Sequence, residues 1–313
     1  MNHIVIETEK TDYTGGDLVN GHFTVHLDEA VPARGIRVRF HGYEKALWTS
    51  GTGKNRTTHS QTRHFFNDEV TVFGQEKLSL SELLADAVSG IFSKDRYEIL
   101  QPGTYEYDFS YTLPFDLPGD FEYRRSRIAY EINAYVDIPL KIDLSATQNL
   151  TIYEPYNPEE ITALSGEKSK RLLFDPANPI EMSGTIDRNM CFPGEEVHGE
   201  LEVTNNSSKM IEAIKVTLNR IVKLKAHGSS LTATDKTELL KIEQPAIQFG
   251  LPAKFELTFQ LPDDLYCSVT TAKLVRVSYE LRVDLDLPWA KDARIKFPLT
   301  ILEEAGMPSG VGR

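Results

Sequence analysis

Apolar and polar residues alternate along much of this chain. In residues 128–138 every second position is apolar, and the same period of two holds over residues 277–287. Successive side chains of a β-strand point to opposite faces of its sheet, so this period predicts strands with one buried face. Pro139 and Pro288 follow the two runs, and proline lacks the N–H that a strand interior requires. We therefore expect both strands to end at these prolines.

The pattern of the first half recurs in the second half. Residues 16–21, Gly-Asp-Leu-Val-Asn-Gly, return as residues 194–199, Gly-Glu-Glu-Val-His-Gly, 178 positions later. The same offset relates Ile36 to Ile214, whereas the run 128–138 returns after 149 positions. Turns and strands in one fixed order indicate a tandem duplication, and 313 residues suffice for two domains of ordinary size.

Short strands, glycine-bearing turns and very little helical periodicity predict an all-β protein of two tandem immunoglobulin-like antiparallel β-sandwiches. The first sandwich is expected at residues 1–153 and the second at residues 180–303. Between them, residues 154–179 carry prolines and charges in place of the alternation and are predicted to form a hinge. Residues 304–313 follow the last expected strand and are predicted to be a flexible tail.

The two offsets differ because the first half carries about 30 extra residues within the segment 42–101. This insertion holds one predicted short helix. Ser79 and Glu82 form a capping box, and apolar residues follow at helical spacing up to Ile91. The polar face of the helix is acidic, which disfavours anionic lipid, so we expect the helix to pack on the first sandwich. The polar segment 49–62 before it is expected to be a long irregular loop.

The formal net charge of −12 argues against nucleic acid and anionic membrane as main partners, because both require a basic excess. Only two cysteines occur, Cys191 and Cys267, and neither has a counterpart in the first half, so a disulfide repeated in both domains is excluded. Low cysteine content and the lack of a long apolar run are typical of a cytoplasmic protein. We expect a soluble protein without a transmembrane segment.

Histidines are the first candidates for a metal or catalytic site. His22 and His26 share one face of a predicted strand, but the strand rise separates them by about 13 Å, too far for one ion. A solvated polar strand face is the simpler interpretation, and His59 and His64 lack a cysteine or carboxylate at ligand spacing. No Gly-x-Ser-x-Gly or Gly-x-x-x-x-Gly-Lys-Ser/Thr motif is present. We therefore predict no enzyme, no catalytic or metal site and no cofactor.

Several turn and strand segments occur in a fixed order across both halves. They are residues 13–21, 36–42, 105–113, 117–121 and 128–132 in the first half, and 192–195, 203–208 and 214–218 in the second. No single segment is specific, but the ordered set resembles the N-terminal and C-terminal domains of the arrestin family. The resemblance is to the α-arrestin, or arrestin-domain-containing, branch and covers nearly the whole chain.

The resemblance implies a non-enzymatic adaptor in protein transport, endocytosis or signalling that docks cytoplasmic tails of membrane proteins or trafficking proteins. It further implies a cytoplasmic protein that its partners recruit to the plasma membrane or endosomes. Many α-arrestins bind ubiquitin ligases through Pro-Pro-x-Tyr motifs, which this sequence lacks, so that recruitment is not expected. Receptor-binding arrestins sense phosphate through paired lysines near the first strand, where this sequence has only Lys10.

Two other functions remain open. A retromer-type cargo-adaptor subunit has similar tandem domains and would bind a helical-solenoid scaffold rather than a receptor. A ligand-binding or enzymatic β-sandwich would instead use the histidine-bearing loop and would require one large apolar pocket with convergent polar groups.

A basic run, Arg124-Arg125-Ser126-Arg127, stands out against the acidic background. The predicted partner-binding residues are Arg124, Arg125, Arg127 and Lys10. Each arginine guanidinium can pair with two oxygens of a carboxylate or phosphate at once, and Lys10 adds a positive charge near the first strand. The competing interpretation is that the arginines form structural salt bridges or a solvated turn. A third possibility, a partner strand added to an exposed sheet edge, needs no particular side chain and leaves no mark in the sequence.

Overall fold

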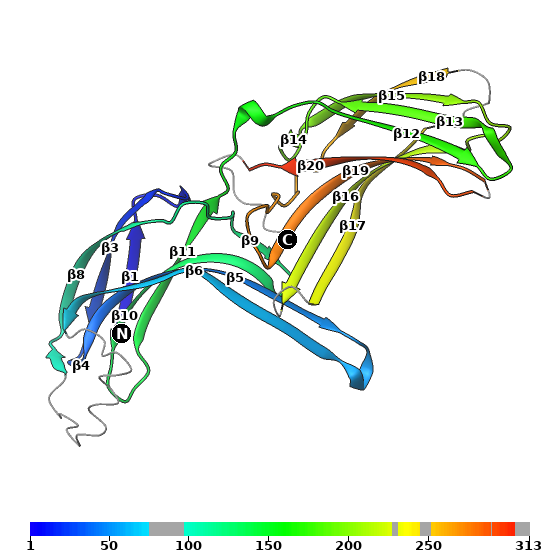
Figure 1. Cartoon of the computed structure of the whole chain (residues 1–313). Helices are drawn as coiled ribbons and strands as arrows, with labels where there is room; N and C mark the ends of the chain where they lie inside the picture. Colours follow the sequence, from blue (N-terminus) through cyan, green and yellow to red (C-terminus); the bar gives the residue numbers. More distant parts are fainter. Residues whose placement is uncertain (75–96, 227–230, 245–251, 289, 304–313) are drawn as a thin grey trace. The chain divides into compact units, whose positions relative to one another are not determined.

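The computed structural model describes residues 1–74, 97–226, 231–244, 252–288 and 290–303. Within these ranges most of the chain is β-strand, joined by turns and by two 3-10 helices of three residues each, which confirms the predicted all-β fold (Figure 1). The alternation of apolar and polar residues accounts for the central strands, because residues 126–137 and 275–286 bury at least every second side chain.

The elements of the first half follow one another in short steps along the chain. They are β1 (His3–Thr8), β2 (Asp12–Thr14), β3 (Leu18–Leu27), β4 (Val31–Ala33), β5 (Gly35–Ser50), the 3-10 helix η1 (Gly53–Asn55), β6 (Thr57–Gly74), β7 (Glu98–Leu100), β8 (Gly103–Thr112), β9 (Phe121–Tyr123), β10 (Ser126–Asp137) and β11 (Leu144–Tyr153).

The second half repeats this succession with one additional strand at its start, and its described residues include no counterparts of the short strands β4, β7 and β9. Its elements are the 3-10 helix η2 (Pro158–Glu160), β12 (Leu164–Leu172), β13 (Asp175–Ile186), β14 (Met190–Cys191), β15 (Glu196–Asn205), β16 (Ala213–Ala226), β17 (Leu231–Gln244), β18 (Pro252–Gln260), β19 (Val275–Asp286) and β20 (Ala293–Ile301).

The chain divides into two compact units. The first comprises Met1–Glu44, Thr62–Asp120 and Ile128–Tyr153, and the second comprises Lys45–Gln61, Phe121–Arg127 and Glu154–Arg313. The second unit therefore includes two short segments of the first half of the chain. One is the outer part of the β5–β6 hairpin, and the other is β9 with the turn that follows it.

In the first half, β1, β3 and β8 form a three-stranded antiparallel sheet in the order β1-β3-β8. A larger sheet has the order β2-β11-β10-β5-β6 with β9 paired to β10, and β4 pairs with β7. In β3, Phe23 and Val25 are fully buried, whereas His22 and Thr24 lie on the outer face. Buried side chains of this kind, from both sheets, form the core of the first unit.

In the second unit, one sheet has the order β12-β13-β15-β18 and the other the order β14-β20-β19-β16-β17. Figure 1 shows these two sheets as two layers. Met182, Leu201 and Val203 of the first sheet are buried, as are Val216 and Leu281 of the second. The unit is therefore a β-sandwich, as predicted.

The duplication is visible in matching strands and turns. β3 and β15 are related by the offset of 178, and β10 and β19 by the offset of 149. Gly16 and Gly194 have φ of 90° and 73°, left-handed values that favour glycine. The N–H groups of these glycines donate to the carbonyls of Pro114 and Pro262, each at 3.2 Å. The same turn thus precedes β3 in the first half and β15 in the second.

A buried tyrosine fastens the same strand in each unit. The Tyr130 hydroxyl on β10 donates to the carbonyl of Pro118 at 2.6 Å, and the Tyr279 hydroxyl on β19 donates to that of Tyr266 at 2.6 Å. Both tyrosines have exposures of 2% or less, so their hydroxyls require an internal partner. Each bond ties a central strand to the loop that precedes it.

Parts of the first half differ from the expectation. The expected helix from Ser79 to Ile91 lies outside the described residues. The expected irregular loop 49–62 is wrong in its length, because β5 and β6 continue into a hairpin that leaves only residues 51–56 between them. Trp48 and His59 stack within this hairpin, with ring centroids 5.1 Å apart.

The predicted hinge, residues 154–179, contains strand structure. β12 and the first residues of β13 fall within it, and the two strands pair antiparallel. Where each domain begins and ends stays a prediction. Residues 304–313, the predicted flexible tail, lie outside the described residues.

Candidate functional site

The predicted arginine run forms the turn between β9 and β10, within the second unit. Arg124 has a left-handed backbone, with φ 57°, and its guanidinium lies 2.8 Å from Oδ2 of Asp235 on β17. The same guanidinium stacks on the ring of Tyr123 at 5.0 Å, and the Tyr123 hydroxyl donates to Asp235. Arg124 is therefore part of a structural ion pair, although its side chain is 71% exposed.

A second arginine holds the same tyrosine. The Arg220 guanidinium on β16 lies 5.5 Å from the ring centre of Tyr123 and 4.7 Å from that of Tyr266. Phe121 packs edge-to-face on Tyr266, with centroids 5.3 Å apart. Burial and the hydrogen bond to Asp235 raise the pKa of Tyr123, so its hydroxyl remains a donor at neutral pH. This aromatic cluster anchors the β9 turn in the second unit.

The other predicted partner-binding residues lie in different units. Arg125, on the β9–β10 turn, and Arg127, near the start of β10, are both exposed in the second unit. Lys10 is exposed in the first unit, in the turn between β1 and β2, where its carbonyl accepts hydrogen bonds from Thr8 and Tyr13. Neither Arg125 nor Lys10 forms an ion pair within the described residues. Partner binding by all four predicted residues stays a prediction.

The histidines of β3 lie on the outer face of the three-stranded sheet. His22 Nε2 is 2.9 Å from Glu7 Oε2 on β1, and the ring of His26 stacks on His3 with 4.6 Å between centroids. In the described part of the chain, no group of three or more His, Cys, Asp or Glu residues is arranged to hold a metal ion. These histidines are cross-strand pairs of a polar sheet surface.

Both cysteines are free thiols. Cys191 is buried, and desolvation raises the pKa of its thiol to about 12. The thiol is therefore protonated and unreactive at neutral pH. Cys267 is only partly buried.

The two units differ clearly at one strand edge. β13, the counterpart of β1, pairs with β12 on one side and with β15 on the other. β1 pairs with β3, and no described strand pairs with its other side. An unpaired strand edge presents a row of backbone N–H and C=O groups to which another strand can be added. No described strand of the first unit therefore pairs with β1 as β12 pairs with β13 in the second, although β11 passes close to β1.

The side chains beneath this position differ as well. In the second unit, Phe297 is buried and its ring packs against Gly166 of β12 and Gly184 of β13. Gln148 on β11 is the counterpart of Phe297, and Ile6 on β1 is the counterpart of Gly184. An apolar ring thus supports β12, whereas a polar, partly exposed amide stands at the same place beside β1.

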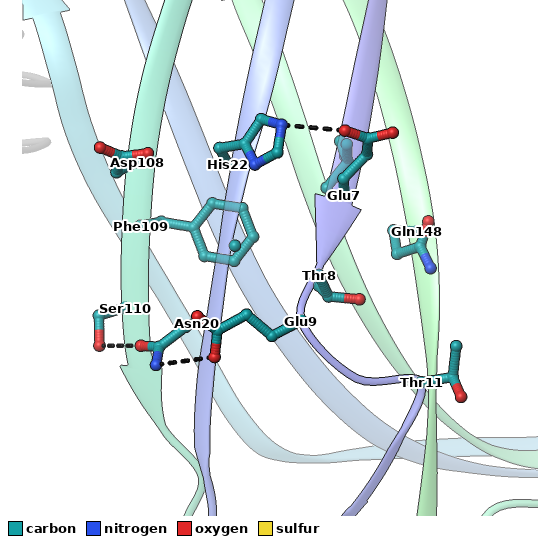
Figure 2. Close-up of a pocket in the computed structure, with 12 residues that line it drawn as sticks. Glu7, Thr8, Glu9, Thr11, Asn20, His22, Asp108, Phe109, Ser110 and Gln148 are labelled. Atoms are coloured by element: carbon teal, nitrogen blue, oxygen red, sulfur yellow. Dashed lines mark hydrogen bonds and ion pairs between the residues drawn. The ribbon is translucent and has the colours of Figure 1, made fainter.

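A groove of about 960 Å³ borders the open edge of β1 and is lined by Ile6, Gln148 and residues of β3 and β8 (Figure 2). Two rows of polar side chains cross the sheet there, Asp108, His22 and Glu7 in one row and Ser110, Asn20 and Glu9 in the other. The Asn20 side chain joins its row, accepting from Ser110 at 2.9 Å and donating to Glu9 at 3.2 Å. The lining therefore includes three carboxylates, and it includes no lysine or arginine.

Sequence reasoning did not find this groove. Glu7, Glu9 and Asp108 resemble any solvated carboxylates of a strand surface. The segment 164–172 could have revealed the open edge, because it lies ahead of the repeated part of the second half and has no counterpart in the first.

Comparison with known proteins agrees with this two-part architecture. Residues 2–158 match the N-terminal domain of arrestin (or S-antigen), and residues 176–305 match its C-terminal domain. The first match alone covers half of the chain. The chain belongs to the arrestin family. Proteins of the arrestin family are adaptors or scaffolds and are generally non-enzymatic, and arrestin-domain proteins generally bind membrane receptors and trafficking proteins.

Similar proteins with curated names are α-arrestins. Arrestin domain-containing protein A of Dictyostelium discoideum is 28% identical over 323 residues, which cover 96% of this arrestin and 51% of the relative. Human arrestin domain-containing protein 4 is 26% identical, with 95% and 70% covered, and rat thioredoxin-interacting protein is 24% identical, with 98% and 74% covered. This arrestin therefore spans about half the length of the Dictyostelium protein. Among the described residues of this arrestin, no helix has the length and hydropathy needed to cross a membrane.

Proposed function

We propose that this arrestin is a non-enzymatic adaptor that binds an extended cytoplasmic segment of a membrane protein or a trafficking protein beside β1. The observation that carries the proposal is the open edge of β1 with the groove along it. A segment added there would gain backbone hydrogen bonds from the strand, and its alternate side chains would enter the groove.

The same proposal extends to where the protein would act. An adaptor of this kind is cytoplasmic and reaches the plasma membrane or endosomes through the tails that it binds. Arg125 in the second unit, which is exposed and lacks an ion pair within the described residues, is the best remaining candidate for a second contact with an acidic segment.

A bulky side chain beside the open edge tests the proposal. The chain is used to probe an array of cytoplasmic-tail peptides of membrane proteins, and the peptides that bind are titrated by fluorescence anisotropy. Gln148→Trp should weaken binding about tenfold or more. Phe297 fits at the matching position because Gly166 and Gly184 leave room for its ring. Ile6 stands where the second unit has Gly184, so the indole would take the room that the partner strand needs. Asn149→Trp is the matched control, since the neighbouring residue of β11 points to the opposite face.

Circular dichroism and thermal unfolding establish that both variants fold. Equal affinities of the wild type and both variants would place the partner elsewhere on the molecule. Failure of every tail peptide to bind would contradict adaptor function at this edge.

A further inference from the structure

We propose that the open edge of β1 selects a partner strand that carries lysine or arginine and disfavours a phosphorylated one. This inference rests on the proposed function and adds the chemical class of segment that the edge accepts. Two observations carry it: the paired strand that the second unit already contains, and the carboxylates that line the groove in the first.

The second unit supplies the geometry of the added strand. β12 runs antiparallel to β13, with Ser165 opposite Thr185 and Leu164 opposite Ile186. Thr185 is the counterpart of Glu7. A segment that paired with β1 in the same register would therefore place one residue directly opposite Glu7. Directly opposed residues of antiparallel strands lie on the same face, with their Cβ atoms about 5 Å apart.

The side chains on that face of the first unit are acidic. The Glu7 side chain is 65% exposed even though it contacts His22. Glu9 is the next residue beyond β1 on the same side of the chain, and Asn20 orients its carboxylate. Asp108 adds a third negative charge at the other end of the His22 row. A lysine or arginine opposite Glu7 would form a cross-strand ion pair, whereas a phosphate there would meet like charge.

Lys10 does not reverse this preference. It lies in the turn after β1 and is not among the residues that line the groove. One cation beside three carboxylates leaves the negative potential in place, and Asp12, the first residue of β2, follows two positions after Lys10. The edge therefore favours positive charge in the segment that it binds.

The expected discrimination is moderate, because the groups are exposed. An exposed ion pair changes affinity by a factor of about 1.4 to 5, and repulsion between like charges acts by a similar factor in the opposite direction. With two charged positions of the segment placed beside Glu7 and Glu9, the lysine form should bind about tenfold more tightly than the phosphoserine form at low salt. The ratio should shrink in 0.5 M salt, since exposed charges are screened.

Three peptides of one pattern test the selection. Each is a fluorescein-labelled nine-residue segment in which valine alternates with a variable residue, and the variable residue is lysine, serine or phosphoserine. Anisotropy titrations with the full chain should rank the affinities lysine, serine, phosphoserine. Gln148→Trp should weaken all three to a similar degree, because it blocks the strand position itself.

A charge-neutral variant isolates the carboxylates. Glu7→Gln with Glu9→Gln should weaken binding of the lysine peptide about fivefold, strengthen binding of the phosphoserine peptide, and leave the serine peptide unchanged. Glu200→Gln with Glu256→Gln is the matched control. It removes the same charge from the outer face of the second unit's sheet and should change none of the three affinities.

The outcomes separate the inference from the proposed function. A phosphoserine peptide that binds as tightly as the lysine peptide, or a ranking that the Glu7 and Glu9 changes do not alter, overturns the selection while the edge remains a binding site. Peptides that bind regardless of Gln148→Trp overturn the edge as the site. If sedimentation shows that the chain alone forms a dimer that Gln148→Trp dissociates, the edge belongs to a second copy and the selection of a partner segment is overturned.

Discussion

Arg37 and Asp137 in the first unit occupy the positions that Lys215 and Asp286 occupy in the second. Arg37 is 2% exposed, and its Nη1 lies 2.7 Å from Oδ2 of Asp137. The side chain of Lys215 is 33% exposed where it pairs with Asp286. The duplication thus kept an ion pair between the same two strands and changed its burial. Burial decides the weight of such a pair, because a buried charge that loses its partner cannot be rehydrated.

The strand edges also differ between the two units, and this difference concerns function. β1 and β13 are counterparts, but only β13 has described partners on both sides. Where the units agree, as in the tyrosine bonds, the contacts serve stability. Where they differ, the first unit leaves open a strand edge that β12 covers in the second, although each unit has a groove on this sheet, of about 960 Å³ in the first and about 1230 Å³ in the second. The differences between copies are therefore the places to test.

Arg37→Ala should produce the largest difference between the units. Asp137 would keep Arg34 but lose its buried partner, so the first unit should lose about 3 kcal/mol of unfolding free energy. Lys215→Ala at the matching position should have a much smaller effect on the second unit. Native-state hydrogen exchange of β10 and β19 reports the two units separately. Equal losses in both would show that burial does not distinguish the pairs.

The two tyrosine hydrogen bonds, unlike the two ion pairs, should contribute equally to the stability of the two units. Tyr130→Phe and Tyr279→Phe each remove one hydroxyl and leave one carbonyl without its 2.6 Å partner. Each unit should lose about 1.5 kcal/mol, measured by the same exchange method. If only one unit lost stability, water would replace the tyrosine hydrogen bond of the other unit without a cost in free energy.

Asp120 and Ser268 accept equivalent hydrogen bonds in the two units, but Asp120 has an ionisable carboxyl group whereas Ser268 has a neutral hydroxyl group. Asp120 accepts from the Ile152 N–H at 3.0 Å, and Ser268 accepts from the Ile301 N–H at 2.9 Å. Desolvation raises the pKa of Asp120 above its ordinary value. A carboxyl group whose folded pKa is raised binds its proton more tightly in the folded state, so its ionisation lowers stability as the pH rises.

Asp120→Asn keeps an acceptor oxygen and removes this cost. The first unit should gain up to about 1 kcal/mol at pH 7, and the gain should vanish as the pH falls through the raised pKa toward 3.8. Ser268→Asp should introduce the same pH dependence into the second unit. Urea unfolding at pH 4 and pH 7 measures both changes. A gain that persists at low pH would mean that the amide stabilises for a reason other than charge.

The arginine turn gives the smallest expected effects. Arg124→Ala should cost the second unit no more than about 1 kcal/mol, because the pair with Asp235 is exposed, and Arg125→Ala should cost nothing measurable. Thermal unfolding provides the comparison. If Arg125→Ala were the more damaging change, the arginine next to Asp235 would not be the structural one.

Much of this architecture could be predicted from the sequence, because the period of two and the repeated turns depend only on residues that are close together in the chain. The alternation in residues 128–138 and 277–287 predicted β10 and β19, and the repeated glycines predicted matching turns. The partner of Arg124 could not be predicted, since Asp235 is 111 residues away and only tertiary packing brings it close. The groove was missed for a related reason. Its lining residues come mainly from β1, β3, β8 and β11, which lie far apart in the sequence, and only tertiary packing brings them together.

Amide hydrogen exchange of β1 tests the central claim most directly. Adding the lysine peptide to the full chain should slow exchange in His3–Thr8 about tenfold or more, because a partner strand would bond the N–H groups of the open edge. Exchange in β13, which β12 already covers, should not change. If β1 exchanges at the same rate with and without saturating peptide, or if protection appears only at another strand edge, the open edge of β1 is not where this arrestin binds its partners.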